Sequence, residues 1–130
     1  MLEMLILICG WLQIALALLH LGMPRYFNWS AALSTTDLLT RQLFYVHTFF
    51  VALTVLLIGV LSVGWHDELL NSSLGTIMCY GIAGFWGIRA SFQWFIYSPK
   101  LWRGKRLETL IHVLFSMLWV GLTTVYFLAA

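Results

Sequence analysis

Four long apolar runs constrain this chain more than any other feature of its sequence. They cover residues 2–21, 43–65, 74–97 and 107–129. A helix needs about 20 predominantly apolar residues to cross the hydrocarbon of a bilayer. In addition, 62% of the 130 residues are hydrophobic and only 9% are charged, which is too few charges to cover a water-soluble domain. The sequence therefore predicts an all-α integral membrane protein, in which residues 1–130 form one four-transmembrane-helix bundle.

The distribution of charge predicts how this bundle is oriented. Six lysine and arginine side chains lie in or beside the loops of residues 22–42 and 98–106. The opposite side of the bundle carries Glu3, Asp67 and Glu68, with no lysine or arginine. The positive-inside rule then makes the two basic loops cytoplasmic and gives an N-out/C-out arrangement. The bacterial cytoplasmic (inner) membrane is the simplest location for so compact a chain, and the net charge of +2 predicts no nucleic-acid partner.

The loop of residues 22–42 contains signals for the helices on either side of it. Pro24 is predicted to end the first helix, because proline lacks the backbone N–H that a helix interior uses. The polar run from Ser34 to Asp37 offers capping groups for the start of the second helix or for a short interfacial turn before it. The intervening aromatic residues suit the headgroup region of a bilayer.

Glycines recur on one side of the third predicted helix. Gly81, Gly84 and Gly87 follow one another at a spacing of three residues. Small residues at such a spacing allow a second membrane helix to approach closely, which favours a role in packing. The alternative is that the same groove accepts a flat ligand, such as a tetrapyrrole or a quinone ring.

Ionisable and amide side chains inside the apolar runs are the strongest functional signal in the sequence. Such groups are costly in lipid, so each one is a candidate for a functional role. His47 lies six residues beyond Arg41, or about 9 Å deeper at 1.5 Å per residue. By the same reasoning the predicted topology brings side chains from all four helices into the cytoplasmic leaflet: His20, His47, Arg89, Gln93, Glu108 and His112.

The chemistry of these side chains predicts a cofactor site. Neutral imidazoles from facing helices can bind a haem iron from both sides, and His47 and His112 are predicted to lie at similar depths. Arg89 is expected to contact a propionate or carboxylate, Gln93 to donate a hydrogen bond, and His20 to lie near the same cofactor. The sequence thus predicts a small electron-transfer subunit that binds haem b or quinone.

Several alternatives use the same residues. A non-haem metal could be held by His20, His47, Glu108 and His112, and a single histidine suffices for a chlorin pigment. The polar groups could instead join helices in a non-catalytic accessory subunit of a larger respiratory or photosynthetic complex, with Arg89 paired to Glu108. A small transporter or a lipid- or isoprenoid-modifying enzyme is a further alternative. The expected partners are membrane lipid and other membrane subunits, or a second copy of the chain.

Overall fold

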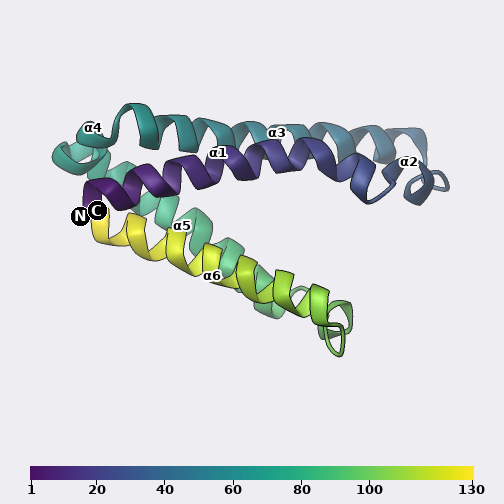
Figure 1. Ribbon diagram of the computed structural model, residues 1–130. Coiled ribbons are helices and arrows are strands. Elements are labelled where there is room, and N and C mark those ends of the chain that lie inside the picture. The colour runs from purple at the N-terminus through teal and green to yellow at the C-terminus, as the bar shows by residue number, and fades with distance from the viewer. The chain divides into compact units, whose positions relative to one another are not determined.

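The computed structural model describes residues 1–130, and all of its regular secondary structure is helical. Figure 1 shows the helices in chain order, from the purple N-terminus to the yellow C-terminus. The elements are α1 (Leu2–Tyr26), α2 (Trp29–Ala32), α3 (Leu38–Gly64), α4 (His66–Asn71), α5 (Ser73–Phe95), the 3₁₀ turn η1 (Pro99–Leu101) and α6 (Arg106–Ala129).

Three of these helices, α1, α3 and α6, have the length and apolar composition that a membrane crossing requires. The fourth long helix, α5, has 23 residues but is less apolar, because it contains four glycines together with Arg89 and Gln93. The prediction of an all-helical membrane protein is consistent with this composition. The four-transmembrane-helix bundle and its N-out/C-out orientation stay predictions.

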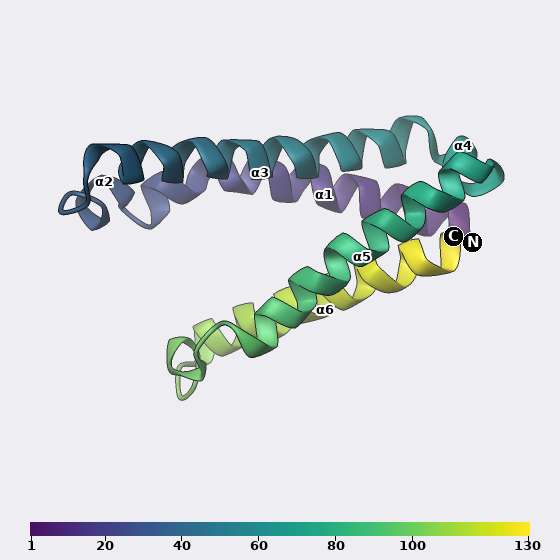
Figure 2. The same ribbon diagram turned by 180° about the vertical axis from the view of Figure 1, so that it is seen from behind.

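The helices belong to two compact units. Residues 7–65 form the first, called here the α1–α3 unit, and residues 1–6 with 66–130 form the second, called the α5–α6 unit. Each unit is built around one pair of long helices. Figure 2, seen from behind, shows the same two helix pairs as Figure 1.

The α1–α3 unit is a helical hairpin whose two helices approach closely at a pair of glycines. A Cβ atom built on Gly59 would lie 2.8 Å from the carbonyl oxygen of Gly10, and one built on Gly10 would lie 2.7 Å from Val63 Cγ2. Small residues of this kind bring membrane helices together. The buried positions on α3 repeat at spacings of three and four residues, as one helix face requires: Ala52, Val55, Gly59 and Ser62.

The sequence predicted that the first helix ends at Pro24, and this prediction is wrong. Helix α1 continues to Tyr26, with the proline inside its last turns. Pro24 removes one helical hydrogen bond, and the pattern resumes where the Phe27 N–H donates to the Met23 carbonyl at 3.0 Å. Membrane helices tolerate proline where the freed backbone group finds other partners. Near a helix end, the loss of one bond leaves the helix intact.

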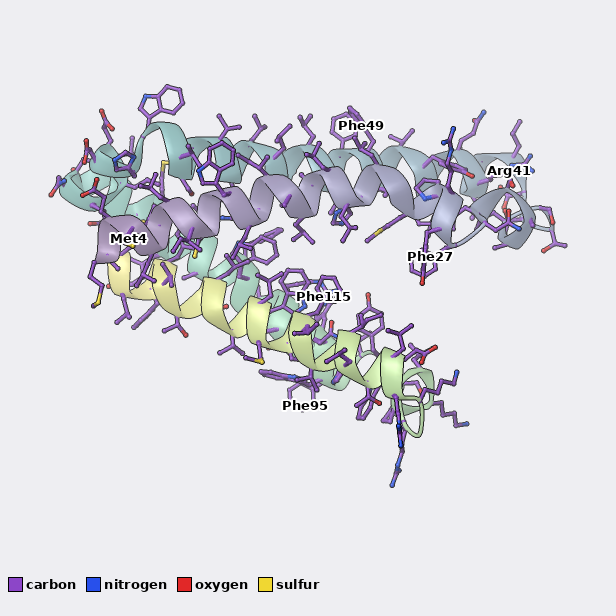
Figure 3. All side chains as sticks on the ribbon, in the orientation of Figure 1. Met4, Phe27, Arg41, Phe49, Phe95 and Phe115 are labelled. Atoms are coloured by element: carbon purple, nitrogen blue, oxygen red, sulfur yellow. The ribbon has the colours of Figure 1, made fainter.

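The predicted cap of the second long helix is confirmed at Asp37, whose carboxylate accepts a hydrogen bond from the Thr40 backbone N–H at 3.0 Å. This cap places the start of α3 at Leu38, earlier than the apolar run suggested. Arg41 lies in the first turns of α3, close to the α2 segment that links the two helices of this unit (Figure 3). The loop therefore contains more helix than its polar composition indicated.

The α5–α6 unit is a second helix pair, in which α5 and α6 run side by side in both views (Figures 1 and 2). Its seam has heptad-like spacing. On α6 the buried positions are Trp119, Leu122, Tyr126 and Ala129. Those on α5 are Gly75, Cys79, Ile82, Ala83, Trp86, Ala90 and Gln93. Spacings of three and four residues are those by which one helix presents a continuous face to another.

One end of the α5–α6 unit brings together the two chain termini and the short helix α4 (Figure 1). A Cβ atom on Gly75 would overlap the carbonyl oxygens of Glu68 and Leu69, so the corner between α4 and α5 requires glycine there. His66 Nε2 lies 3.3 Å from a Glu3 carboxylate oxygen and 3.7 Å from one of Asp67. The basic connector between α5 and α6 lies at the other end of the unit.

Candidate functional site

Gln93 lies at the centre of a polar network between α5 and α6. Its side-chain oxygen accepts hydrogen bonds from Arg89 Nη1 and from Trp119 Nε1, both at 3.3 Å. Its side-chain nitrogen lies 2.9 Å from His112 Nδ1. The residue is buried, with 8% of its surface exposed. Gln93 therefore joins two other predicted site residues, Arg89 and His112, each of which contacts its side chain.

Helical spacing places these groups together. Arg89 and Gln93 are four residues apart on α5 and so share a face, while His112 and Trp119 are seven apart on α6. Gln93 and Trp119 are both buried positions of the seam. Because the helix seam fixes Gln93 and Trp119, the polar network forms part of the packing between α5 and α6.

The hydrogen bonds of Gln93 determine the proton position on His112. Arginine and the tryptophan indole can only donate, so the Gln93 oxygen must face them and the amide N–H must face His112. His112 Nδ1 then accepts a hydrogen bond, and the neutral imidazole has its proton on Nε2. This Nε2–H group makes no hydrogen bond within the chain, so it is a free donor in a half-buried side chain.

Arg89 has aromatic neighbours but no carboxylate partner. Its guanidinium carbon lies 4.8 Å from the centre of the Trp119 ring and 5.5 Å from that of Tyr97, distances typical of cation–π contacts. The two close acid–base pairs of the structure both involve His66. The ion pair between Arg89 and Glu108, one of the alternatives drawn from the sequence, is not formed. Glu108 is exposed in the first turn of α6. Arg89 thus keeps its positive charge available to an anion or a carbonyl oxygen.

Aromatic rings enclose the network. Helical spacing in the sequence indicates only one of them, Trp119, which lies seven residues beyond His112 on the same helix face. Trp102 stacks on the His112 ring with centroids 4.4 Å apart and planes at 13°. Trp119 stacks on Trp86 at 5.1 Å and on Phe115, labelled in Figure 3, at 5.4 Å. The indole N–H of Trp102 is buried and has no hydrogen-bond partner. Tryptophans near membrane boundaries are common, so the sequence alone gave no reason to separate Trp102 from an interfacial belt.

The remaining predicted ligands, His20 and His47, belong to the α1–α3 unit. In each, ring Nδ1 lies 2.8 Å from the carbonyl oxygen four residues earlier, Leu16 for His20 and Leu43 for His47. A carbonyl can only accept, so Nδ1 carries the proton and Nε2 keeps its lone pair. His47 is exposed, whereas His20 lines a pocket of about 170 Å³ with Trp29, Tyr45 and other side chains. These two histidines therefore have the opposite tautomer to His112.

The sequence predicted that His47, His112 and Glu108 bind a metal ion, with His20 as a further ligand. The group of three metal-ligand side chains in the α5–α6 unit lies elsewhere, where ligand atoms of Glu3, His66 and Asp67 come within 4.8 Å of one another. In contrast, His112 has its Nδ1 occupied by Gln93. The geometry around His112 is that of a hydrogen-bonding site with several donors.

Gly87 is the one residue of the glycine row that faces α6. A Cβ atom there would lie 3.5 Å from Thr123 Cγ2, whereas nothing lies within 4 Å of one on Gly81 or Gly84. Close packing against α6 therefore involves only part of the row.

No protein-family model, curated protein or solved structure matches the chain, so no relative indicates a role for any of these residues.

Proposed function

We propose that the protein is a small integral membrane subunit that binds a quinone at Arg89, Gln93 and His112 and takes part in electron transfer. One observation carries the proposal: the Gln93 amide makes His112 a hydrogen-bond donor through Nε2. The unpartnered Trp102 N–H and the uncompensated Arg89 guanidinium add two more donors nearby. A site with this composition suits a ligand that accepts hydrogen bonds.

Quinones have the corresponding chemistry. Their two carbonyl oxygens accept hydrogen bonds, their ring is flat and apolar, and their isoprenoid tail keeps them in the bilayer. The ring of Trp102 offers a surface for a flat ring, and it already stacks on His112 in this unit. In this proposal, His112 Nε2–H and Arg89 bind and orient a carbonyl oxygen, while Gln93 holds both residues in place.

A haem iron at His112 fits these hydrogen bonds less well. An axial histidine needs an unprotonated nitrogen to bind iron, and its second nitrogen normally donates a hydrogen bond. At His112 the neutral ring has its proton on Nε2, and Nδ1 is occupied by Gln93. The joint haem clamp of His47 and His112 is therefore not the function we favour.

Haem b is a second candidate, at a different location. His20 and His47 donate through Nδ1 and leave Nε2 unprotonated, which is the tautomer that an axial ligand requires. A haem bound through either side chain would involve the α1–α3 unit. The quinone and haem proposals thus depend on different histidines, so one set of variants can separate them.

The proposal includes a membrane arrangement. We infer that α5 crosses the bilayer beside α6, because the two helices share a continuous seam and the Gln93 side chain of α5 is hydrogen-bonded within it. Four crossings, with the connector of residues 98–106 in the bacterial cytoplasm, would place the network in the cytoplasmic leaflet. The accessory-subunit, transporter and lipid-enzyme alternatives use the same arrangement without a redox ligand.

The first test is the cofactor content of gently purified protein. We expect about one extractable quinone per chain in the wild type, lost in His112→Ala and kept in His47→Ala. A reduced-minus-oxidised haem spectrum that disappears in His47→Ala would establish the second candidate. A folded protein that contains neither group in any preparation would reject both proposals and favour a structural role.

A further inference from the structure

A shallow, open depression along the first turns of α6 lies beside the proposed quinone site and does not include its residues. It has a volume of about 520 Å³ and is lined by Gly104, Lys105, Arg106, Thr109, Leu110 and Val113. His112 and Gln93 are not among the lining residues, so the two sites use different faces of α6. We call this surface the α6 trough.

The α6 trough has one basic end and one apolar end. Lys105 and Arg106 are exposed, and neither is paired with a carboxylate. Below them, Leu110 and Val113 are 54% and 44% exposed. From Arg106 to Val113 the helix rises by about 10 Å, at 1.5 Å per residue. The trough therefore extends from the start of a candidate membrane helix well into its apolar part.

Backbone groups add to the positive character of the basic end. The residue before α6, Lys105, makes no side-chain cap hydrogen bond, whereas Asp37 and Ser72 cap α3 and α5. The first N–H groups of α6 are thus open to an acceptor, and a helix N-terminus favours negative charge. This feature supports the two cations and does not define a site alone.

The geometry points to an anionic phospholipid as the occupant of the α6 trough. Its phosphate would contact Lys105 and Arg106, and one acyl chain would lie along Leu110 and Val113. Charge complementarity and the position of the trough at the start of a membrane helix favour this occupant over a soluble anion. A topology signal accounts for basic residues in the connector, but it does not require an apolar trough directly beneath two of them.

The connector supplies a matched control. Lys100 and Arg103 lie in the same nine-residue segment and line a separate pocket, of about 510 Å³, with Ser98 and Pro99. The pairs Lys105/Arg106 and Lys100/Arg103 have equal charge, so replacing either pair by glutamine changes the net charge equally. Each double variant also keeps two connector cations, which preserves the charge bias that orients the helices.

The test is native mass spectrometry of the full chain released from nanodiscs that contain equal amounts of phosphatidylglycerol and phosphatidylcholine. We expect one retained phosphatidylglycerol, reduced at least about tenfold in Lys105→Gln/Arg106→Gln and less than about twofold in Lys100→Gln/Arg103→Gln. Val113→Trp, which fills the apolar end without changing charge, should reduce retention as well. Circular dichroism of each variant checks that the helices remain folded.

Three outcomes would overturn the proposal. Equal losses in the two double variants would mean that only the general charge of the connector attracts lipid. Full retention in Val113→Trp would mean that no acyl chain occupies the trough. Displacement of the lipid by an equal concentration of inorganic phosphate would indicate a site for soluble anions. The lipid and quinone proposals stay distinguishable, because lipid retention is measured separately and none of the substituted residues is Arg89, Gln93, His112 or Trp102.

Discussion

At the scale of single residues, the Gln93 amide determines what its neighbours can do. Its two ends are distinct, and the donors Arg89 and Trp119 occupy the oxygen end. His112 is consequently left with a protonated Nε2, while His20 and His47 bond through a protonated Nδ1. Hydrogen-bonding partners alone thus divide three histidines of the candidate membrane helices α1, α3 and α6 into two chemical types.

The first prediction concerns these tautomers. In ¹⁵N-histidine NMR spectra at a pH where the rings are neutral, His112 should show a protonated Nε2, and His20 and His47 a protonated Nδ1. Single His→Asn variants assign the signals. A protonated Nδ1 on His112 would contradict the Gln93 network as described.

The sequence identified the polar members of this network but not the role of Trp102 in it. Arg89, Gln93 and His112 stand out because polar groups are costly within apolar runs. Trp102 does not, since tryptophan is common near membrane boundaries. Trp119 shares a helix face with His112 by its spacing, but its hydrogen bond to Gln93 depends on the helix seam. The hydrogen bonds of the Gln93 side chain could not be predicted from the sequence either. Its amide can turn either its oxygen or its nitrogen toward a given neighbour.

At the scale of helices and turns, close packing distinguishes glycines that look alike in the sequence. Gly59 faces the backbone of Gly10 across the α1–α3 unit, whereas nothing lies within 4 Å of a Cβ atom on Gly64. Both residues belong to α3. The same amino acid on the same helix therefore has two different roles.

The second prediction compares Gly59→Ala with Gly64→Ala. The added methyl group at residue 59 should destabilise the protein by about 1–3 kcal/mol, because the neighbouring backbone must move. At residue 64 alanine should be neutral or stabilising by up to about 1 kcal/mol, as expected from helix propensity. Unfolding of each variant by SDS in mixed micelles, followed by circular dichroism, measures the difference. Equal effects at the two positions would contradict the described contact.

The third prediction concerns the cap of α3. Hydrogen bonds from the Thr40 hydroxyl and then from its backbone N–H lower the pKa of Asp37 below its ordinary value. A lowered pKa in the folded state stabilises the cap above the unfolded value, about 3.9, and this stabilisation is lost as the pH falls through the folded value. Hydrogen exchange of the Thr40 amide should therefore accelerate in acid relative to Asp37→Asn, which caps without a titrating group. Equal pH dependence in both proteins would show that the carboxylate does not protect this turn.

The helices themselves follow from the sequence more closely than their ends do. The apolar runs predicted α1, α3, α5 and α6, and the polar run before Leu38 correctly indicated a cap at Asp37. The proline signal was wrong, because one missing hydrogen bond near a helix end does not stop the helix. The short helix α4 was also missed, since its six residues contain too little periodicity to distinguish a helix from a turn.

At the scale of the whole molecule, the number of crossings depends on α5. Three helices satisfy the requirements of length and apolar composition, and α5 does not. With α5 in the bilayer, the turn near Asn71 and the connector near Leu101 lie on opposite sides. Without it, both lie on the same side.

The fourth prediction tests this arrangement by cysteine labelling in intact cells. In a background of Cys9→Ala and Cys79→Ala, an impermeant maleimide should label Asn71→Cys in intact cells, and Leu101→Cys only after lysis. Both positions are exposed, and neither substitution removes a charge. Labelling of both from the same side would mean that α5 does not cross the membrane.

The most direct test of the quinone proposal is an equilibrium titration of the full chain in nanodiscs with a short-tailed quinone, followed by tryptophan fluorescence. We predict saturable quenching in the wild type and an apparent Kd at least about tenfold higher in Gln93→Ala, which leaves the site donors without their common partner. Gln13→Ala removes another buried glutamine, from the α1–α3 unit, and should bind as the wild type does. Quenching that fails to saturate, or that is the same in all three proteins, would contradict quinone binding at Arg89, Gln93 and His112.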